Sequence, residues 1–369
     1  MTHSSPSGPG QPDRRDPPQE AGAGGTSPPA GAGPGAREPV AGEPSGSEAV
    51  ATVAREVPAA RLAAAAGELA AAIEARVLGQ QEAVTVLLAA YIAGGHALLE
   101  GLPGLGKTRL ARTFAQCLGA RFSRVQFTPD LMPADLVGTN VFDAGAGFRL
   151  LRGPVFTDVL MADEINRTPP KTQSALLEAM QEGQVTIDGE THPLGAGFFV
   201  VATQNPIELE GVYPLPEAQL DRFLVRIEMS LPSRAAELEL LRQAVAGTLD
   251  AAPGASLLAP GEAAALRRGS RRVHVAEELL DYLVRLAAAS RRSPHVELGV
   301  SPRAVLALLE AARAVALIEG REYAAPDDVK RLLVPCWAHR LIVTPEAELE
   351  GHTPRQILEQ AAAAEPVPH

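Results

Sequence analysis

The sequence predicts an α/β fold in which a parallel sheet is flanked by helices and is followed by a small, all-helical C-terminal domain. Three observations carry this prediction. A strand, a glycine-rich loop and a helix start follow one another within residues 96–118. Apolar runs at 159–162 and 198–202 are typical of parallel strands buried on both faces, and helical patterns alternate with them. After Pro232 the sequence indicates helices only.

The first 55 residues do not predict a domain. No Val, Leu, Ile, Phe, Tyr or Trp occurs from Met1 to Pro39, where Pro, Gly, Ala and Ser dominate. Such a segment cannot bury enough apolar surface to offset its chain entropy. We expect residues 1–55 to be a disordered tail that serves as a flexible tether.

The first helices lead directly to the glycine-rich loop. Residues 57–76 are rich in Ala and Leu and predict an amphipathic helix that ends at Val77–Gln80, and a second helix follows over 81–93. After the strand at 96–100 comes Gly101-Leu-Pro-Gly-Leu-Gly-Lys-Thr108, which matches the pattern G-x-x-x-x-G-K-[ST]. A helix over 110–118 completes the unit.

This pattern has a physical basis as a triphosphate site. Glycines let the backbone curl so that N–H groups point at phosphate oxygens, and the helix N-terminus adds partial positive charge. Lys107 reaches the β- and γ-phosphates and Thr108 binds Mg²⁺. The lysine is informative because the chain has only three lysines among its 33 basic residues. The loop residues expected to bind ATP are Gly101, Pro103, Gly104, Leu105, Gly106, Lys107, Thr108 and Arg109.

The middle of the chain predicts the rest of the sheet and two hairpins. Alternation predicts a strand over 121–127, and turn residues within 128–158 predict an inserted hairpin with a short helical piece. A second hairpin is expected around Asp188-Gly189. The remaining elements are strands at 159–164, 198–203 and 224–229 and helices at 170–182 and 216–223.

Polar residues end two of the buried strands. Isolated buried carboxylates are costly, so Asp163 and Glu164 at a strand end imply a cation or a catalytic water. We expect Asp163 to bind Mg²⁺ and Glu164 to polarise the water that attacks the γ-phosphate. Asn205 follows the neighbouring strand, where its amide orients the same water or, as an Asn before Pro206, simply forms a turn.

Two arginines each allow two interpretations. Arg222 is either a locally paired surface charge or an arginine that reaches the γ-phosphate of a neighbouring subunit, which requires an oligomer. Arg303 begins one of the C-terminal helices, which are expected at 234–246, 276–289, 302–318 and 326–333. It is either a solvated first-turn residue or a contact from a mobile lid to the phosphates, and the mild cost of a cation at a helix N-terminus favours an anionic partner.

Composition excludes several classes of partner and location. A net charge of −11 argues against a general nucleic-acid or anionic-membrane surface. The apolar stretch at 83–99 is interrupted by Gly94-Gly95, and the N-terminus has no apolar signal region, so neither membrane insertion nor export is expected. Cys117 and Cys336 are expected to be buried packing thiols in a reducing cytoplasm, outside any metal site.

Taken together and in order, these motifs resemble those of AAA+ ATPases and are most similar to the MoxR family. The segments that carry the resemblance are Glu100–Thr108, Gln126–Gly138, Asp163–Arg167, Ala202–Pro206 and Glu210–Phe223. The resemblance implies that Lys107 and Thr108 form Walker A, Asp163 and Glu164 form Walker B, Asn205 is sensor 1, Arg222 is the arginine finger and Arg303 is sensor 2. It also places Val77, Leu78 and Gly79 near the adenine.

The resemblance further implies a domain plan and partners. Residues 56–231 would form the nucleotide-binding domain, with a helix-2 insert at about 128–158 and a pre-sensor hairpin at about 183–197. Residues 232–345 would form the lid, and 346–369 a C-terminal helix and tail. The implied assembly is a homo-oligomer, a hexameric ring with both hairpins facing its pore. The implied role is a chaperone-like one that matures partner proteins, including those with von Willebrand factor A domains, or inserts a metal or cofactor into them.

Two other functions remain open at this point. A nucleic-acid motor of the same AAA+ branch is expected to carry Lys or Arg on its pore hairpins, whereas no Lys or Arg occurs from Thr172 to Asp221. A nucleotide-dependent binding switch would bind ATP with negligible hydrolysis. Glu164 and Asn205 favour hydrolysis over this switch.

Overall fold

The computed structural model describes residues 57–145, 147–205, 212–249, 256–259 and 261–368. The tail expected at 1–55 lies outside the described residues. The described residues form one compact unit.

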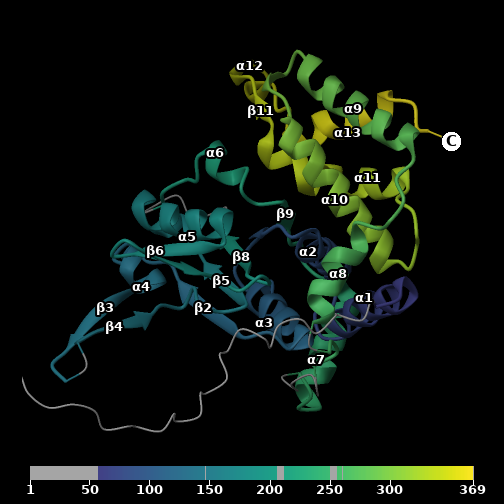
Figure 1. Cartoon of the computed structure of the whole chain (residues 1–369). Helices are drawn as coiled ribbons and strands as arrows, with labels where there is room; N and C mark the ends of the chain where they lie inside the picture. The colour runs from purple at the N-terminus through teal and green to yellow at the C-terminus, as the bar shows by residue number, and fades with distance from the viewer. Residues whose placement is uncertain (1–56, 146, 206–211, 250–255, 260, 369) are drawn as a thin grey trace, which may run out of the picture. The chain divides into compact units, whose positions relative to one another are not determined.

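A five-stranded parallel sheet forms the centre of the α/β part, as the sequence predicts (Figure 1). Its strand order is β2-β5-β8-β1-β9, so β8 lies between β5 and β1. Apolar residues on both faces explain why these short runs pair as buried strands. The strands are β1 (Ala97–Glu100), β2 (Phe122–Gln126), β5 (Val159–Asp163), β8 (Phe199–Gln204) and β9 (Val225–Glu228).

Alternate side chains of the strands pack into two separate hydrophobic cores, one on each face of the sheet. Leu99, Met161 and Val201 pack in the core that includes α1, α2 and α3, whereas Leu98 and Leu160 pack in the core that includes α4 and α5. This is the period-2 alternation expected of a strand. The helices are α1 (Ala59–Glu74), α2 (Gln81–Ala93), α3 (Lys107–Leu118), α4 (Pro133–Val137) and α5 (Pro170–Glu182).

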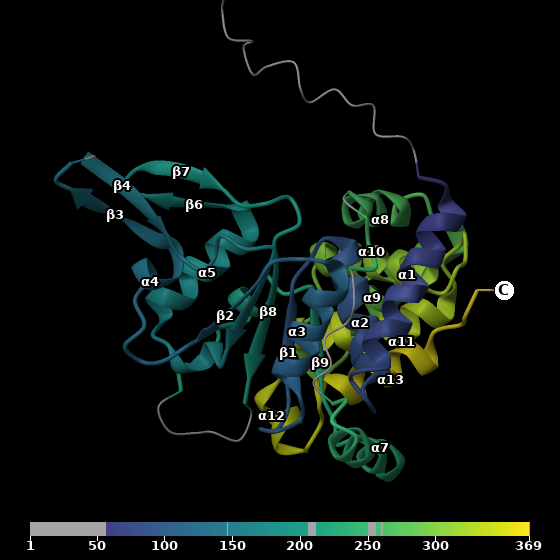
Figure 2. The same ribbon diagram turned by 90° about the horizontal axis from the view of Figure 1, so that it is seen from below.

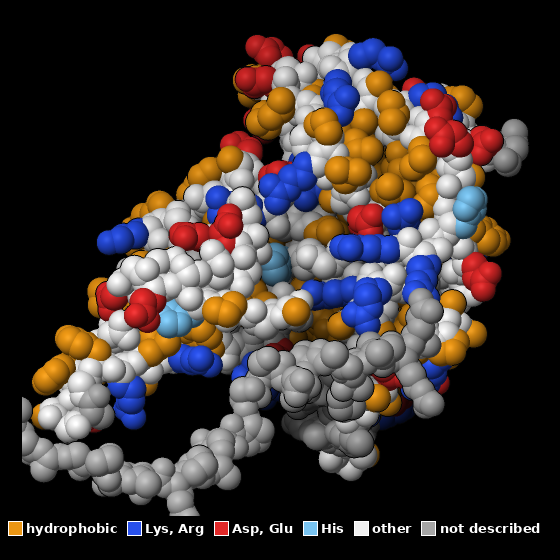
Figure 3. All heavy atoms as spheres, in the orientation of Figure 1, with side chains coloured by type: hydrophobic (Ala, Val, Ile, Leu, Met, Phe, Trp, Pro, Cys, Tyr) orange, Lys and Arg blue, Asp and Glu red, His pale blue; other side chains and the backbone are white. Residues whose placement is uncertain are grey.

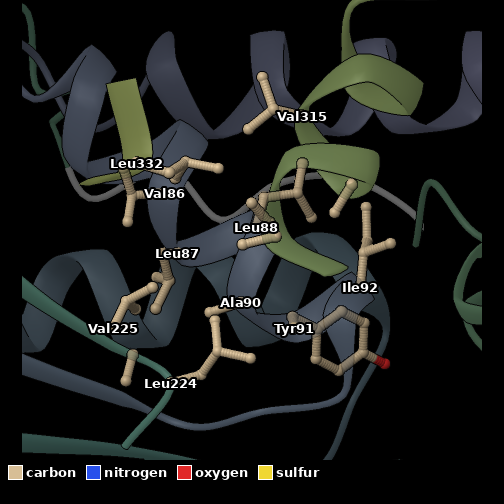
Figure 4. Close-up of a cluster of buried hydrophobic side chains, with 14 of the residues drawn as sticks. Val86, Leu87, Leu88, Ala90, Tyr91, Ile92, Leu224, Val225, Val315 and Leu332 are labelled. Atoms are coloured by element: carbon tan, nitrogen blue, oxygen red, sulfur yellow. The ribbon is translucent and has the colours of Figure 1, made fainter. Parts of the chain in front are cut away.

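Helix α2 is apolar on all sides, and all its residues from Ala83 to Ile92 are buried. Figure 4 shows why, since Leu87 points toward Val225 of β9 while Val86 points toward Leu332 of the C-terminal helices. A helix with no polar face is stable only when it is enclosed by protein. α2 therefore joins the sheet to the C-terminal helices.

Two antiparallel hairpins extend from the sheet, as the sequence predicts. β3 (Gly138–Asp143) pairs with β4 (Gly147–Arg152), and β6 (Gln184–Ile187) pairs with β7 (Glu190–Pro193). The hairpins lie side by side in both ribbon views (Figures 1 and 2), and Asn140 Nδ2 donates to Asp188 Oδ2 at 2.9 Å. They therefore form a common projection from one side of the sheet.

The C-terminal part is helical with small departures from the prediction. The helices predicted for this part are present. In the α/β part, the helix expected at 216–223 is only a single turn, α6 (Glu217–Leu220). α8 was not predicted, and neither was the short antiparallel pair of β10 (Val296–Leu298) and β11 (Ile342–Val343), so this part is not helical throughout. The helices are α7 (Arg234–Val245), α8 (Glu262–Ser270), α9 (Glu277–Arg292), α10 (Pro302–Ile318), α11 (Pro326–Trp337), α12 (Pro345–Leu349) and α13 (Pro354–Ala364).

Within the described ranges, no helix is both long enough and apolar enough to cross a membrane.

Cys117 and Cys336 are both buried free thiols, and burial raises the pKa of the Cys336 thiol to about 12. Both thiols therefore serve in packing, as expected.

Candidate active site

The glycine-rich loop leads directly from β1 into α3. Gly104 and Gly106 have φ values of 85° and 87°, a left-handed conformation that favours glycine. The 12-residue helix α3 begins at Lys107, whose Nζ donates to the Gly101 carbonyl oxygen at 2.5 Å across the loop. The loop thus places a cationic side chain beside the amide end of a helix, which is the arrangement that binds phosphate groups.

The two acids lie at the end of β5 and share one hydroxyl partner. Thr203 Oγ1 donates to Asp163 Oδ1 at 2.5 Å and accepts the Glu164 backbone N–H at 2.8 Å. Glu164 itself has a φ of 57°, a strained conformation for a non-glycine residue. The Thr203 hydroxyl therefore fixes both acids, a role that sequence reasoning missed.

Side chains of β2 complete a hydrogen-bond network around the acids. Arg124 donates to Asp163 Oδ2 from Nε at 3.0 Å and from Nη2 at 2.5 Å. Gln126 Nε2 donates to Glu164 Oε2 at 2.7 Å, and the same carboxylate lies 3.2 Å from Arg167 Nε. These residues were also missed. For the two β2 residues the only signal is their position on an edge strand, where Gln126 is level with Asp163 and Arg124 lies two residues earlier.

Strand register brings the loop and the acids to the same edge of the sheet. Glu100, just before the loop, pairs with Gln204 of β8, and Ala162 of β5 pairs with Ala202 of β8. The loop strand and the acid strand are therefore two strand positions apart, about 10 Å. Buried Asn205 follows β8 between them. Thr108 and Asp163 supply the hydroxyl and carboxylate oxygens that Mg²⁺ prefers, so the donor set fits a Mg²⁺–triphosphate complex.

Glu100 adds a buried negative charge beside the loop. It pairs with Arg226 at 2.7 Å. Burial nevertheless raises the pKa of Glu100, against the opposing effects of Arg226 and Lys107. Glu100 therefore takes up a proton more readily than a free glutamate does, next to the phosphate-binding loop.

The segment expected near the adenine lies between α1 and α2. Gly79 has a φ of 74°, and a Cβ there would lie 2.8 Å from Pro232 Cβ, so no larger residue fits without movement. The side chain of Arg109 donates to the carbonyls of Arg76 and Leu249 at 2.9 and 2.6 Å, and its contact with nucleotide stays a prediction. Its guanidinium therefore holds Arg76, the residue before Val77–Gly79, against α3, the helix that follows the glycine-rich loop.

The structure brings Arg222 and Arg303 together, but near the amino end of β1, whereas the loop follows the carboxyl end of the same strand. Both line a cavity of about 260 Å³ that also contains His96, the residue before β1. Arg303 Nη1 lies 3.8 Å from Asp221 Oδ2, and the chain after Asp221 pairs with His96 through the Leu224 N–H. β1 lies between this cavity and the phosphate-binding loop of the same chain, so Arg303 lies away from its own loop here. A contact of Arg303 with phosphates stays a prediction.

The fold and this site define a P-loop ATPase of the AAA+ class. Residues 96–225 match the model of the ATPase family associated with various cellular activities (AAA), and residues 288–361 match the AAA lid domain.

Relatives narrow the class to a family. The chain is 44% identical to YeaC of Bacillus subtilis over 79% of this chain and 91% of that protein. It is 42% identical to chaperone MoxR1 of Mycobacterium tuberculosis over 76% and 77%. A crystal structure of a candidate ATPase from Cytophaga hutchinsonii superposes with a TM-score of 0.78 at 37% identity, over 84% of this chain and 97% of the other. The chain belongs to the MoxR family of AAA+ ATPases.

Proposed function

We propose that this chain hydrolyses ATP in an oligomeric ring and uses the energy to remodel a protein partner. The observation that supports the proposal most directly is the Thr203 hydroxyl, which lies on β8, between the acid strand β5 and the loop strand β1, and bonds both Asp163 and Glu164. Within this proposal, residues 56–231 form the nucleotide-binding domain, 232–345 the lid and 346–369 the C-terminal helix and tail.

The residues of the site divide the chemistry between them. Lys107 and the first amides of α3 hold the β- and γ-phosphates, and Glu164 accepts the proton of the attacking water. Asn205 holds that water in line. Mg²⁺, held by Thr108 and Asp163, would neutralise phosphate charge when bound. Gln126 keeps the Glu164 carboxylate directed along the sheet edge at 2.7 Å.

The position of Arg222 and Arg303 supports assembly. Both side chains lie at the sheet edge remote from their own loop, so they serve the ATP of a neighbouring subunit in this proposal. Arg340 holds the segment between Asp221 and Phe223 by donating to both carbonyls, at 3.1 and 2.9 Å. A closed ring, which we take to be a hexamer, supplies each site with a neighbour.

The hairpins offer a surface for a protein partner. Phe142 and Phe148 at the end of the β3–β4 hairpin are 66% and 77% exposed, and their ring centres are 5.3 Å apart. Figure 3 shows hydrophobic side chains gathered at the free end of this hairpin. An exposed apolar pair marks a contact site for apolar segments of a partner. A von Willebrand factor A domain as partner, insertion of a metal or cofactor, and a cytoplasmic location belong to the same proposal.

The apolar hairpin end also argues against a nucleic-acid motor. Backbone phosphates call for Lys and Arg on the contacting surface. In β6 and β7 neither residue occurs, and the β3–β4 hairpin carries Arg149 and Arg152 on β4 together with Asp143 on β3. The MoxR1 relative is named a chaperone, which favours a protein partner.

Affinity capture tests the proposal. The variant Glu164→Gln should bind ATP, fail to hydrolyse it and retain partner proteins that wild type releases. Glu182→Gln, an exposed residue at the end of α5, is the matched control and should behave as wild type. Equal turnover by Glu164→Gln and wild type would remove Glu164 from its role.

A further inference from the structure

A second cluster of ligand-forming side chains lies in the C-terminal helical part, on elements that the proposed ATP site does not use. One ligand atom from each of His295, Glu350 and His352, a ring nitrogen or a carboxylate oxygen, lies within 4.8 Å of the other two. The imidazole ring centres are 4.1 Å apart with an interplanar angle of 31°, and His352 Nε2 lies 3.6 Å from Glu350 Oε2. Three donors from segments 55 residues apart thus meet at one point.

The backbone around His295 is fixed by the short sheet that the sequence did not predict. His295 precedes β10, and its carbonyl accepts the Thr344 N–H at 3.0 Å, just after β11. Thr344 in turn caps α12 by accepting the Ala347 N–H at 3.3 Å. The strand pair therefore places His295 beside the helix that leads to Glu350, at the end of the helical part where β11 and α12 lie in Figure 1.

The other two donors are held by a tight turn between two capped helices. Gly351, with a φ of 83°, lies between Glu350 and His352, and a left-handed residue at this point is most easily glycine. The His352 N–H donates to the Ala347 carbonyl at 2.9 Å. Thr353 then caps α13 through a reciprocal bond pair with Gln356. The turn therefore holds both side chains on the His295 side without help from a ligand.

The donor set selects the class of ion. Two imidazoles and one carboxylate suit borderline divalent ions such as Zn²⁺, whereas Mg²⁺ prefers oxygen donors. Two imidazoles bound at about 2.1 Å to one ion at a tetrahedral angle place their ring centres about 5.3 Å apart. The two rings, now 4.1 Å apart, therefore have to separate by about 1 Å when the ion binds. Three protein donors leave one coordination position for water or a group from a partner.

We propose that His295, Glu350 and His352 form a binding site for a transition-metal dication of the Zn²⁺ class, separate from the Mg²⁺–ATP site. The ion joins the loop after α9 to the turn after α12. Since it binds the folded chain at a site that unfolding separates, it raises the unfolding temperature.

Metal binding to the untagged full chain tests this proposal. Zn²⁺ is titrated without nucleotide, in millimolar Mg²⁺, against a chromophoric chelator. We expect one Zn²⁺ per chain at this site, and His295→Asn or His352→Asn should each weaken it by at least about tenfold. The exposed Glu350→Gln change should weaken it too and cannot affect the core. His274→Asn, an exposed histidine outside this cluster, is the control.

A second measurement keeps the test independent of variant folding. Co²⁺ bound by wild type should give visible absorption of a low-coordinate site that Zn²⁺ displaces, and Zn²⁺ should raise the unfolding temperature of wild type but not of the double variant His295→Asn/His352→Asn. Zn²⁺ affinity unchanged in all three single variants, or no Zn²⁺ bound under these conditions, would overturn the proposal and leave the cluster as a surface histidine pair. ATP hydrolysis by the variants is expected to be retained, so this result does not depend on the proposed function.

Discussion

Arg124 of β2 donates two hydrogen bonds to one carboxylate oxygen of Asp163 on the neighbouring strand, at 3.0 Å from Nε and 2.5 Å from Nη2. Asp163 is the residue proposed to hold Mg²⁺. In the proposed site a fixed cation on this carboxylate would compete with the metal for the same oxygen, so we expect Arg124 to raise the Mg²⁺ concentration that the site requires.

Removing that cation should therefore lower the Mg²⁺ requirement. For Arg124→Gln we expect the Mg²⁺ concentration at half-maximal ATPase activity to fall about two- to fivefold, since a partly exposed ion pair contributes about 0.5–1 kcal/mol. Steady-state phosphate release across a Mg²⁺ series measures this. Arg121→Gln is the control, because Arg121 pairs with Asp158 at the other end of β2. An unchanged or higher requirement in Arg124→Gln would show that Arg124 does not compete with the metal.

The Glu164 carboxylate should matter for turnover and not for binding. We expect Glu164→Gln to reduce the ATPase rate by about a hundredfold or more, the usual contribution of a positioned general base. ATP affinity in the presence of Mg²⁺ should change little. Rapid-quench single-turnover assays beside equilibrium binding separate the two effects. A variant with weakened binding and normal turnover would contradict the assignment.

Arg222 and Arg303 should act between subunits. Arg222→Ala and Arg303→Ala should each bind ATP as wild type does and lose turnover in the assembled state. Mixing Arg222→Ala with Glu164→Gln should restore part of the activity, because some interfaces then combine an intact Glu164 with an intact neighbouring Arg222. Arg242→Ala on α7 is the control. Mixtures as inactive as their components would argue against action between subunits.

Acid should destabilise the fold through His96. The Val200 N–H donates to His96 Nδ1 at 3.0 Å, so Nε2 carries the proton that bonds the Met180 carbonyl at 3.1 Å. Burial lowers the pKa of His96 to about 4, while an unfolded histidine titrates near 6.5.

The direction in which pH changes the stability follows from these two pKa values. The contribution of neutral His96 to the free energy of unfolding is complete above about pH 6.5. It is lost as the pH falls toward 4, because only the unfolded chain takes up the proton between these pH values. Its size is about 3 kcal/mol. Urea unfolding between pH 7.5 and 5 should show a steeper loss of stability in wild type than in His96→Asn. Parallel profiles would mean that His96 is not held neutral.

The exposed hairpin pair should serve a partner and not the fold. Phe142→Ser with Phe148→Ser should lower the free energy of unfolding by no more than about 1 kcal/mol, the contribution of an exposed cross-strand aromatic pair. ATPase activity without a partner should stay the same. In the Glu164→Gln background the double change should abolish partner retention. Retention at the original level would place the partner contact elsewhere.

The sequence predicts the phosphate-binding loop, the paired acids and both hairpins because each is encoded in a continuous stretch. Lys107 and Thr108 are adjacent to the glycines that position them, and Asp188-Gly189 defines its own turn. Local spacing is sufficient for such features.

Other features depend on tertiary packing and were not predictable in this way. Thr203 and Arg124 reach Asp163 only through strand register, across 40 and 39 residues of chain. The position of Arg303 depends on how the C-terminal helices pack against α2 and the segment around Asp221. Strands as short as β10 and β11 carry no periodic signal, which is why the Zn²⁺-class cluster beside them was missed.

The loop around Lys107 and the carboxylate of Asp163 are proposed to bind ATP and Mg²⁺ together in one site, and every other proposed role depends on this. Calorimetric titration of the purified chain with ATP, with and without Mg²⁺, tests this most directly in wild type, Lys107→Ala and Asp163→Asn. We predict one ATP per chain, binding that Mg²⁺ strengthens, loss of binding in Lys107→Ala and loss of the Mg²⁺ effect in Asp163→Asn. ATP binding that is indifferent to Mg²⁺, or that neither substitution alters, would contradict the account.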